Sequence, residues 1–230
     1  MNTKSFFTGY GWRTGIVLVL FLVVFFRITQ GWNMAALAQT SEPVVILAFG
    51  DSLTAGYGLD PAHSYPSLLQ ERLTRDGFQV AVVNAGISGD TSAGGLARLE
   101  WTLSGIDPGP HLAIVELGAN DGLRGDDPAN MEANLDAILS ILKERGVTVL
   151  FTGMKAMANL GDEYTVEYDA VFPRLAEKHG VAFFPFFLQD VAGVPELNQW
   201  DGLHPNEKGT ERVTGNIYPL VKELLQSMRP

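Results

Sequence analysis

The 230-residue sequence contains no cysteine. A disulfide framework, a zinc–thiolate site and a thiol nucleophile are therefore all excluded. Basic residues are also scarce, because 16 Lys and Arg stand against 26 Asp and Glu and give a formal net charge of −10. An acidic chain lacks the Lys and Arg surface that binding to a phosphate backbone requires, so we do not expect nucleic acid as a partner. Without disulfides the fold must depend on its hydrophobic core, which a chain of this length can supply.

Long apolar runs are missing except near the N-terminus. Lys4 and Arg13 precede the apolar run 15–26, and the small-x-small segment 36–38 follows it. A basic start, a short apolar run and such a segment are typical of a secretory signal peptide. Because the run is shorter than the ~20 residues that span a bilayer, we expect residues 1–38 to be cleaved and the protein to be periplasmic or secreted. The stretch containing Arg27 and Trp32, between the run and the cleavage site, leaves open a retained N-terminal membrane anchor.

Strand-like and helix-like patterns alternate through the rest of the chain. We expect strands at 44–47, 78–83, 111–117, 147–151 and 181–187, and helices at 64–76, 91–103, 127–145, 166–178 and 207–228. The strands are continuously apolar, which indicates a parallel sheet covered on both faces. There is no internal repeat, so residues 39–230 are expected to form one α/β domain.

One serine stands where the first strand is expected to end. Ser52 lies in the segment 48–58, whose glycines let the backbone turn sharply after the strand. In an open parallel sheet, ligands bind at the carboxyl ends of the strands. Ser52 is therefore a candidate nucleophile, although a helix N-cap is an equally good interpretation of this motif alone. For Asp51, which precedes it, we expect a structural hydrogen-bonding role.

Four further residues are expected at the same edge of the sheet. Gly89 and Asn120 follow the second and third strands, and Asp201 and His204 follow the fifth. We expect His204 to take the proton of Ser52 and Asp201 to orient His204. The backbone N–H groups of Ser52 and Gly89 and the amide of Asn120 would then face the oxyanion.

Each of these residues also has a purely structural interpretation. Asp201 and Gly202 could form an ordinary turn, which would leave His204 as a surface residue. Asn120 could belong to an Asx turn, and Gly89 could serve only its own turn.

The residues quoted so far resemble four sequence blocks of the SGNH (GDSL) hydrolase family. The blocks are Gly50-Asp51-Ser52-Leu53, Gly89, Gly118-x-Asn120-Asp121 and Asp201-x-x-His204. Segments 84–92, 95–99, 115–125, 185–187 and 201–206 are similar to the arylesterase, thioesterase I and lysophospholipase L1 subgroup. The resemblance implies a three-layer α/β/α flavodoxin-like sandwich with a five-stranded parallel sheet, and hydrolysis of esters or thioesters. It also implies that no metal or other cofactor is needed, with Ser52, Asp201 and His204 as triad and Ser52, Gly89 and Asn120 as oxyanion hole.

The loop after the fourth strand departs from the family pattern. Where relatives tend to carry a proline, this chain has the segment 155–161. We expect Met157, Asn159 and Leu160 to contact substrate, with the flexible Met157 and Leu160 forming an adaptable apolar wall.

The expected substrate is a small-molecule or lipid ester, with transient contact with a membrane surface and no obligate protein partner. Two alternatives stay open at this point. One is an esterase that removes O-acetyl groups from polysaccharide. The other is a non-catalytic binding module that kept the fold.

Overall fold

A five-stranded sheet forms the centre of the chain in the computed structural model, which describes Met1 and residues 42–228. The expected signal peptide therefore falls almost wholly outside the described residues. The strands are β1 (Val44–Gly50), β2 (Val80–Gly86), β3 (Leu112–Glu116), β4 (Thr148–Thr152) and β5 (Ala182–Phe184). All neighbours pair in parallel, in the order β2-β1-β3-β4-β5. This is the flavodoxin-like order, and it confirms the expected fold class.

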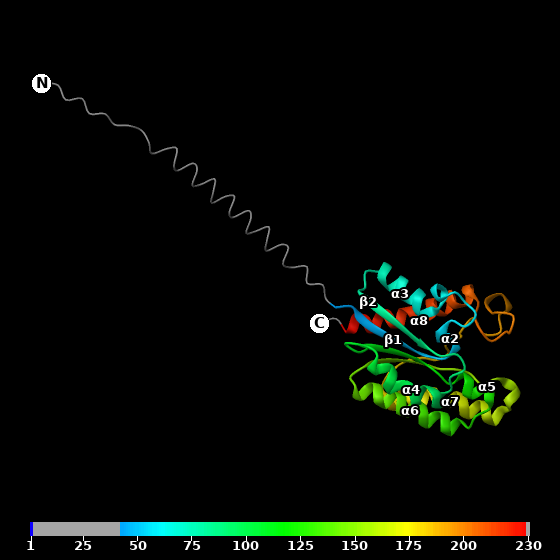
Figure 1. The fold of residues 1–230 in the computed structure, drawn as a ribbon. Coiled ribbons are helices and arrows are strands. Elements are labelled where there is room, and N and C mark those ends of the chain that lie inside the picture. The colour runs from blue at the N-terminus through cyan, green and yellow to red at the C-terminus, as the bar shows by residue number, and fades with distance from the viewer. Residues whose placement is uncertain (2–41, 229–230) are drawn as a thin grey trace. The chain divides into compact units, whose positions relative to one another are not determined.

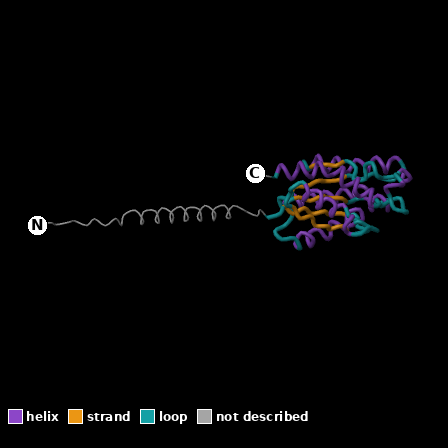
Figure 2. Tube along the Cα trace, turned by 90° about the horizontal axis from the view of Figure 1, so that it is seen from above, coloured by secondary structure: helices purple, strands orange, loops and turns teal. Residues whose placement is uncertain are grey.

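Helices cover both faces of the sheet. They are α2 (Ser52–Ala55), α3 (Tyr65–Arg75), α4 (Ser92–Ser104), α5 (Ala119–Arg124), α6 (Pro128–Glu144), α7 (Asp162–His179) and α8 (Glu207–Ser227), with 3₁₀ turns η1 (Pro61–His63), η2 (Ala158–Leu160) and η3 (Pro195–Leu197). Figure 1 shows α3 and α8 on one face and α4, α6 and α7 on the other. Figure 2, seen from above, shows the strands in orange running side by side. Within the described residues, no helix is long and apolar enough to cross a bilayer.

The core is densest along the two central strands. The segments 46–49 of β1 and 112–115 of β3 are fully buried, because both faces of these strands lie against helices. Such burial stabilises the fold by about 1.5–3 kcal/mol per large apolar side chain. The centre of the sheet is thus a rigid support for the loops that leave its carboxyl edge.

Four of the expected boundaries described next were wrong. Phe78 does not begin β2, because its N–H bonds to Leu73 O and closes the end of α3. Pairing with β1 instead carries β2 on to Gly86. Helix α7 begins at Asp162 rather than 166, with acidic residues in its first turn, which suits the positive end of the helix dipole. Strand β5 ends at Phe184, because Pro185 has no N–H to donate to a neighbouring strand.

Candidate active site

Ser52 begins the four-residue helix α2, directly after β1. Asp51 caps this helix, since its Oδ1 accepts from Leu53 N at 2.9 Å. At the other end, Gly56 adopts a positive φ of 78°, and a Cβ there would lie 2.7 Å from the Ser64 Cβ. The nucleophile candidate therefore stands on a single helical turn that is fixed at both ends. The serine is not itself the cap, which leaves its hydroxyl for other chemistry.

The hydroxyl of Ser52 contacts the imidazole of His204. Ser52 Oγ lies 2.8 Å from His204 Nε2, and His204 Nδ1 lies 2.7 Å from Asp201 Oδ2. A carboxylate only accepts hydrogen bonds, so His204 carries its proton on Nδ1 and Nε2 is the acceptor for the serine hydroxyl. Residues 152 positions apart in the chain are thus brought together.

Asp201 is held as a carboxylate. Its Oδ1 accepts from the backbone N–H groups of Leu203 at 2.9 Å and His204 at 3.1 Å. Burial opposes its ionisation, but these bonds and the bond from the His204 ring outweigh burial and lower the pKa of Asp201 to about 2. Because Asp201 stays ionised at pH values well above this pKa, it keeps the His204 ring in one orientation.

The amide of Asn120 lies beside Ser52 but is already engaged. Asn120 is near the start of α5, and its Nδ2 donates to Asp51 Oδ2 and to Asp90 O, both at 2.9 Å. The two protons of this amide therefore have acceptors within the protein. Asn120 links the end of β1 to the loop that follows β2.

Gly89 lies in that loop, in a turn closed by Asp90 N donating to Ile87 O. Its φ of +87° belongs to the left-handed region that favours glycine. Arg124 Nη2 donates to Gly89 O at 2.8 Å. Gly89 is exposed and lies outside the lining of the cavity described next.

A cavity of about 510 Å³ opens beside Ser52 and His204. Its wall is mainly apolar and comes from the loops after β1, β3, β4 and β5; the large apolar residues are Leu53, Leu123, Met154, Met157, Phe186, Leu188 and Leu203. Met157 thus lies where the sequence predicted a substrate wall. Asn159 and Leu160 do not line the cavity, because η2 turns the chain toward α7, and Leu160 lies near Gly125.

Sequence reasoning missed two features of this site. The ring of Tyr57 lies 4.6 Å from the ring of His204, centroid to centroid. Phe186 and Leu188 form part of the cavity wall. Their positions just beyond the fifth strand were a usable signal, since every strand-to-helix loop reaches this edge. For Tyr57 the sequence offered no signal other than its closeness to Ser52 in the chain.

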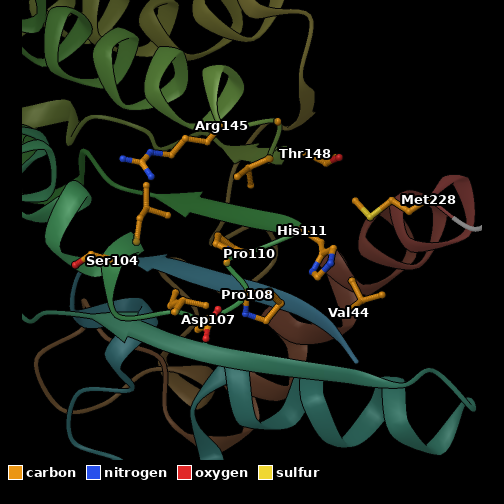
Figure 3. Close-up of a pocket in the computed structure, with 14 residues that line it drawn as sticks. Val44, Ser104, Asp107, Pro108, Pro110, His111, Arg145, Thr148 and Met228 are labelled. Atoms are coloured by element: carbon orange, nitrogen blue, oxygen red, sulfur yellow. The ribbon is translucent and has the colours of Figure 1, made fainter. Parts of the chain in front are cut away.

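A larger hollow of about 880 Å³ lies at the opposite edge, where the strands begin (Figure 3). It is lined in part by Val44, His111 and Thr148, at the starts of three strands. His111 Nδ1 accepts from Val45 N at 3.1 Å, so this ring supports the backbone. The smaller cavity is the candidate active site because it holds the Ser52–His204 pair.

The hydrogen-bonded chain of Ser52, His204 and Asp201 beside an apolar cavity is the arrangement that serine hydrolases share. A sequence profile of the GDSL-like lipase/acylhydrolase family matches residues 48–212. The chain belongs to this family. Among the residues that the structure describes, no group of three His, Asp or Glu side chains could hold a metal ion.

Proteins similar to this chain include named esterases. "Esterase TesA" of Pseudomonas aeruginosa is 40% identical over 192 residues, which are 84% of this chain and 94% of that protein. "Thioesterase 1/protease 1/lysophospholipase L1" of Escherichia coli K12 is 40% identical over 161 residues, 70% and 75% of the two chains. A crystal structure of TesA superposes with a TM-score of 0.74 at 41% identity and covers 78% of this chain and 99% of its own. The chain is accordingly an enzyme that acts on ester substrates.

Proposed function

We propose that this protein is an exported serine esterase that hydrolyses acyl or aryl esters or thioesters through an acyl-enzyme. The observation that carries the proposal is the hydrogen-bonded chain from Ser52 Oγ through the His204 ring to Asp201, at 2.8 and 2.7 Å. The order of atoms in this chain is what nucleophilic activation of a serine requires.

In the first half of the reaction, Ser52 Oγ attacks the carbonyl carbon while His204 Nε2 accepts the hydroxyl proton. His204 then gives this proton to the departing alcohol or thiol, and Ser52 is left acylated. In the second half, water attacks the acyl carbon while His204 takes a proton from the water; the bond from this carbon to Ser52 Oγ then breaks, His204 returns the proton to Oγ, and the acid leaves. Asp201 stabilises the imidazolium in both halves.

The oxyanion would be bound by three donors. Ser52 is the first residue of α2, and the first N–H groups of a helix have no partner within the helix. Gly89 N–H and Asn120 Nδ2 are the other two. Since Asn120 already donates to Asp51 and Asp90, the oxyanion would compete for one of its two protons. Such a donor is worth roughly 3–4 kcal/mol when its bond forms mainly in the transition state.

The cavity would bind the acyl or aryl group. Its volume of about 510 Å³ falls in the range of small-ligand sites, and Met154, Met157 and Phe186 offer it apolar surface. We assign substrate contact to Met157. The positions of Asn159 and Leu160 outside the lining support at most a contact with the far end of a longer substrate.

The test of the proposed function is direct. Ser52→Ala should abolish turnover of p-nitrophenyl esters, and a fluorophosphonate probe should label wild type but not this variant. Wild-type turnover by folded Ser52→Ala would overturn the mechanism. Rates on matched esters and thioesters of several acyl lengths would then rank the substrates. Acetylated polysaccharide in the same panel would test the alternative that the enzyme removes O-acetyl groups from polysaccharide. Intact mass of the protein secreted by its host would show whether the chain is cut after Ala38.

A further inference from the structure

Two carboxyl groups are buried next to the segment that carries Ser52. Asp51 and Glu116 are both fully buried. Glu116 ends β3 and is paired in register with Gly50 of β1, and Asp51 directly follows Gly50. A Cβ placed on Gly50 would lie 2.6 Å from Glu116 Oε2, which shows how closely β1 packs against this side chain.

Glu116 is bonded to the segment that carries the nucleophile. Its Oε2 accepts from Thr54 Oγ1 at 2.8 Å and from Asp51 N at 3.4 Å. Thr54 belongs to α2, and Asp51 caps this helix. Glu116 therefore contacts both sides of Ser52 in the chain without touching Ser52 itself.

The surroundings of Glu116 do not favour a negative charge. Its Oε1 is buried and has no hydrogen-bond partner within the described residues. The ionisable groups that face it are two further acids, Asp51 and the buried phenol of Tyr65 on α3. Burial first, and then the charge of Asp51, raise the pKa of Glu116 well above its ordinary value. Burial also raises the pKa of Asp51 to about 6, against the opposing effect of its hydrogen bonds and of His204.

Two carboxylates cannot both ionise here at low cost, because like charges in a buried site repel strongly. The negative charge is more stable on Asp51, because its two oxygens accept hydrogen bonds from Leu53 N and Asn120 Nδ2. In Glu116 only one oxygen, Oε2, accepts hydrogen bonds, from the Thr54 hydroxyl and from the Asp51 N–H. A neutral Glu116 has a proton that the neighbouring Asp51 carboxylate can accept.

We propose that Glu116 is a positioning residue that acts as an uncharged carboxylic acid, holding Asp51 and α2 so that Ser52 and Asn120 keep their places in the active site. The path runs from Glu116 to the backbone N–H of Asp51 and the hydroxyl of Thr54, and from the Asp51 carboxylate to the amide of Asn120. This inference rests on the proposed function, because it assigns Glu116 a role in the placement of a catalytic serine.

The decisive variants are Glu116→Gln and Glu116→Leu. Glutamine has the shape of the neutral acid, with one oxygen to accept and an N–H to donate, whereas leucine has neither. Glu116→Gln should keep kcat within about 3-fold of wild type. Glu116→Leu should lower kcat about 10- to 100-fold with KM within about 2-fold, since small displacements of reacting groups are costly. Fluorophosphonate labelling of Ser52 should slow in parallel. Glu100→Gln, at an exposed position on α4, is the matched control and should change nothing.

Any one of three results would overturn the proposal. If folded Glu116→Gln lost as much kcat as Glu116→Leu, the active site would require a negatively charged Glu116. If Glu116→Leu kept the wild-type kcat, Glu116 would contribute to packing alone and would not position Ser52. Should the leucine variant not fold, the infrared carbonyl band of a protonated carboxylic acid decides. The band should be present at pH 7 in wild type and in Ser52→Ala, and lost in Glu116→Gln; no difference would refute an uncharged Glu116. Because this readout needs no turnover, failure of the esterase assignment would be recognised separately.

Discussion

The amide of Asn120 and the carboxylate of Asp51 are hydrogen-bonded to each other at 2.9 Å, and both residues line the cavity that Ser52 lines. A second bond of equal length runs from the same nitrogen to Asp90 O. The candidate oxyanion donor is thus oriented before substrate arrives. Because both protons of this amide have acceptors, one of the two bonds must be exchanged for the bond to the oxyanion, while the other keeps the amide in place.

Asn120→Ala should lower kcat by about 10²- to 10³-fold and change KM little, because the bond to the oxyanion forms mainly in the transition state. Steady-state kinetics on a short p-nitrophenyl ester measures both constants. The exposed Asn159 on η2 supplies the matched Asn→Ala control. An Asn120→Ala enzyme with unchanged kcat would remove Asn120 from the oxyanion hole.

Asp201→Asn should lower kcat by about 10⁴-fold, as expected when the partner of a catalytic histidine no longer fixes its tautomer. The pKa of Asp201, lowered to about 2, means that this carboxylate stays ionised throughout the pH range of an ordinary assay. The loss should therefore be similar at every pH between 5 and 9. A loss that disappeared at one end of that range would contradict the role given to Asp201.

Stability should rise as the pH falls from 7 to 5, and Asp51 should be a main cause. The folded chain binds a proton at Asp51 with a pKa of about 6, against the ordinary 3.8. As the pH falls through 6, the folded state gains a proton that the unfolded state does not yet bind, so the free energy of unfolding increases, by up to about 3 kcal/mol below pH 4. Urea unfolding at pH 7 and pH 5 measures the change.

Asp51→Asn is the control for this effect, since it removes the titrating group and leaves the four histidines of the chain in place. The stabilisation between pH 7 and pH 5 should be smaller in this variant than in wild type. Equal changes in the two proteins would show that Asp51 does not take up the proton.

Met157→Ala should raise KM for an octanoyl ester about 3- to 10-fold and affect an acetyl ester less. Met157 lines the cavity, and loss of its apolar contact should cost about 1 kcal/mol with a long chain and little with a short one. Asn159→Ala, two residues away and outside the lining, should leave both substrates unaffected. An equal rise in KM for the two variants would mean that bound substrate extends beyond the cavity.

Arg98→Met should destabilise the fold by roughly 3 kcal/mol. Arg98 Nε lies 2.5 Å from Asp90 Oδ2, with side-chain exposures of 13% and 16%, and Nη2 donates to Gly50 O at 2.9 Å. Its guanidinium also lies 4.2 Å from the centre of the Phe49 ring. Removing one partner of such a pair leaves a poorly solvated charge.

Arg75→Met is the comparison for this prediction, since the Arg75–Glu71 pair is about two-thirds exposed and contributes little. Its effect on the free energy of unfolding, measured by urea denaturation, should be under about 0.5 kcal/mol. A similar loss in both variants would show that burial of the Arg98 pair has no special consequence.

The sequence predicted the order of elements because each strand is continuously apolar and each helix amphipathic. It also predicted that Ser52 and His204 meet, because a parallel sheet brings every strand-to-helix loop to one edge. The register of the strands and the geometry of the side chains could not be predicted from the sequence. That Asn120 donates to Asp51, and that η2 turns Leu160 away from the cavity, depend on distances between segments that no local pattern encodes.

The boundaries failed for a related reason. Phe78 reads as a strand residue by composition, but closure of the preceding helix decides its place. Glu116 went unnoticed because an acid in an apolar run gives no sign of its partners. Buried polar groups are recognised only once the residues on adjacent strands are known.

The single turn that holds Ser52 has consequences for how this enzyme can be altered. Gly50 has no room for a side chain, and Gly56 combines a left-handed backbone with close contact to Ser64. Substituting either glycine should displace the serine, whereas the half-buried Leu53 and Ala55 between them leave room for change. Libraries that aim at new acyl specificity should therefore diversify Leu53 and Ala55 alone, and keep both glycines and the residues that fix the nucleophile constant.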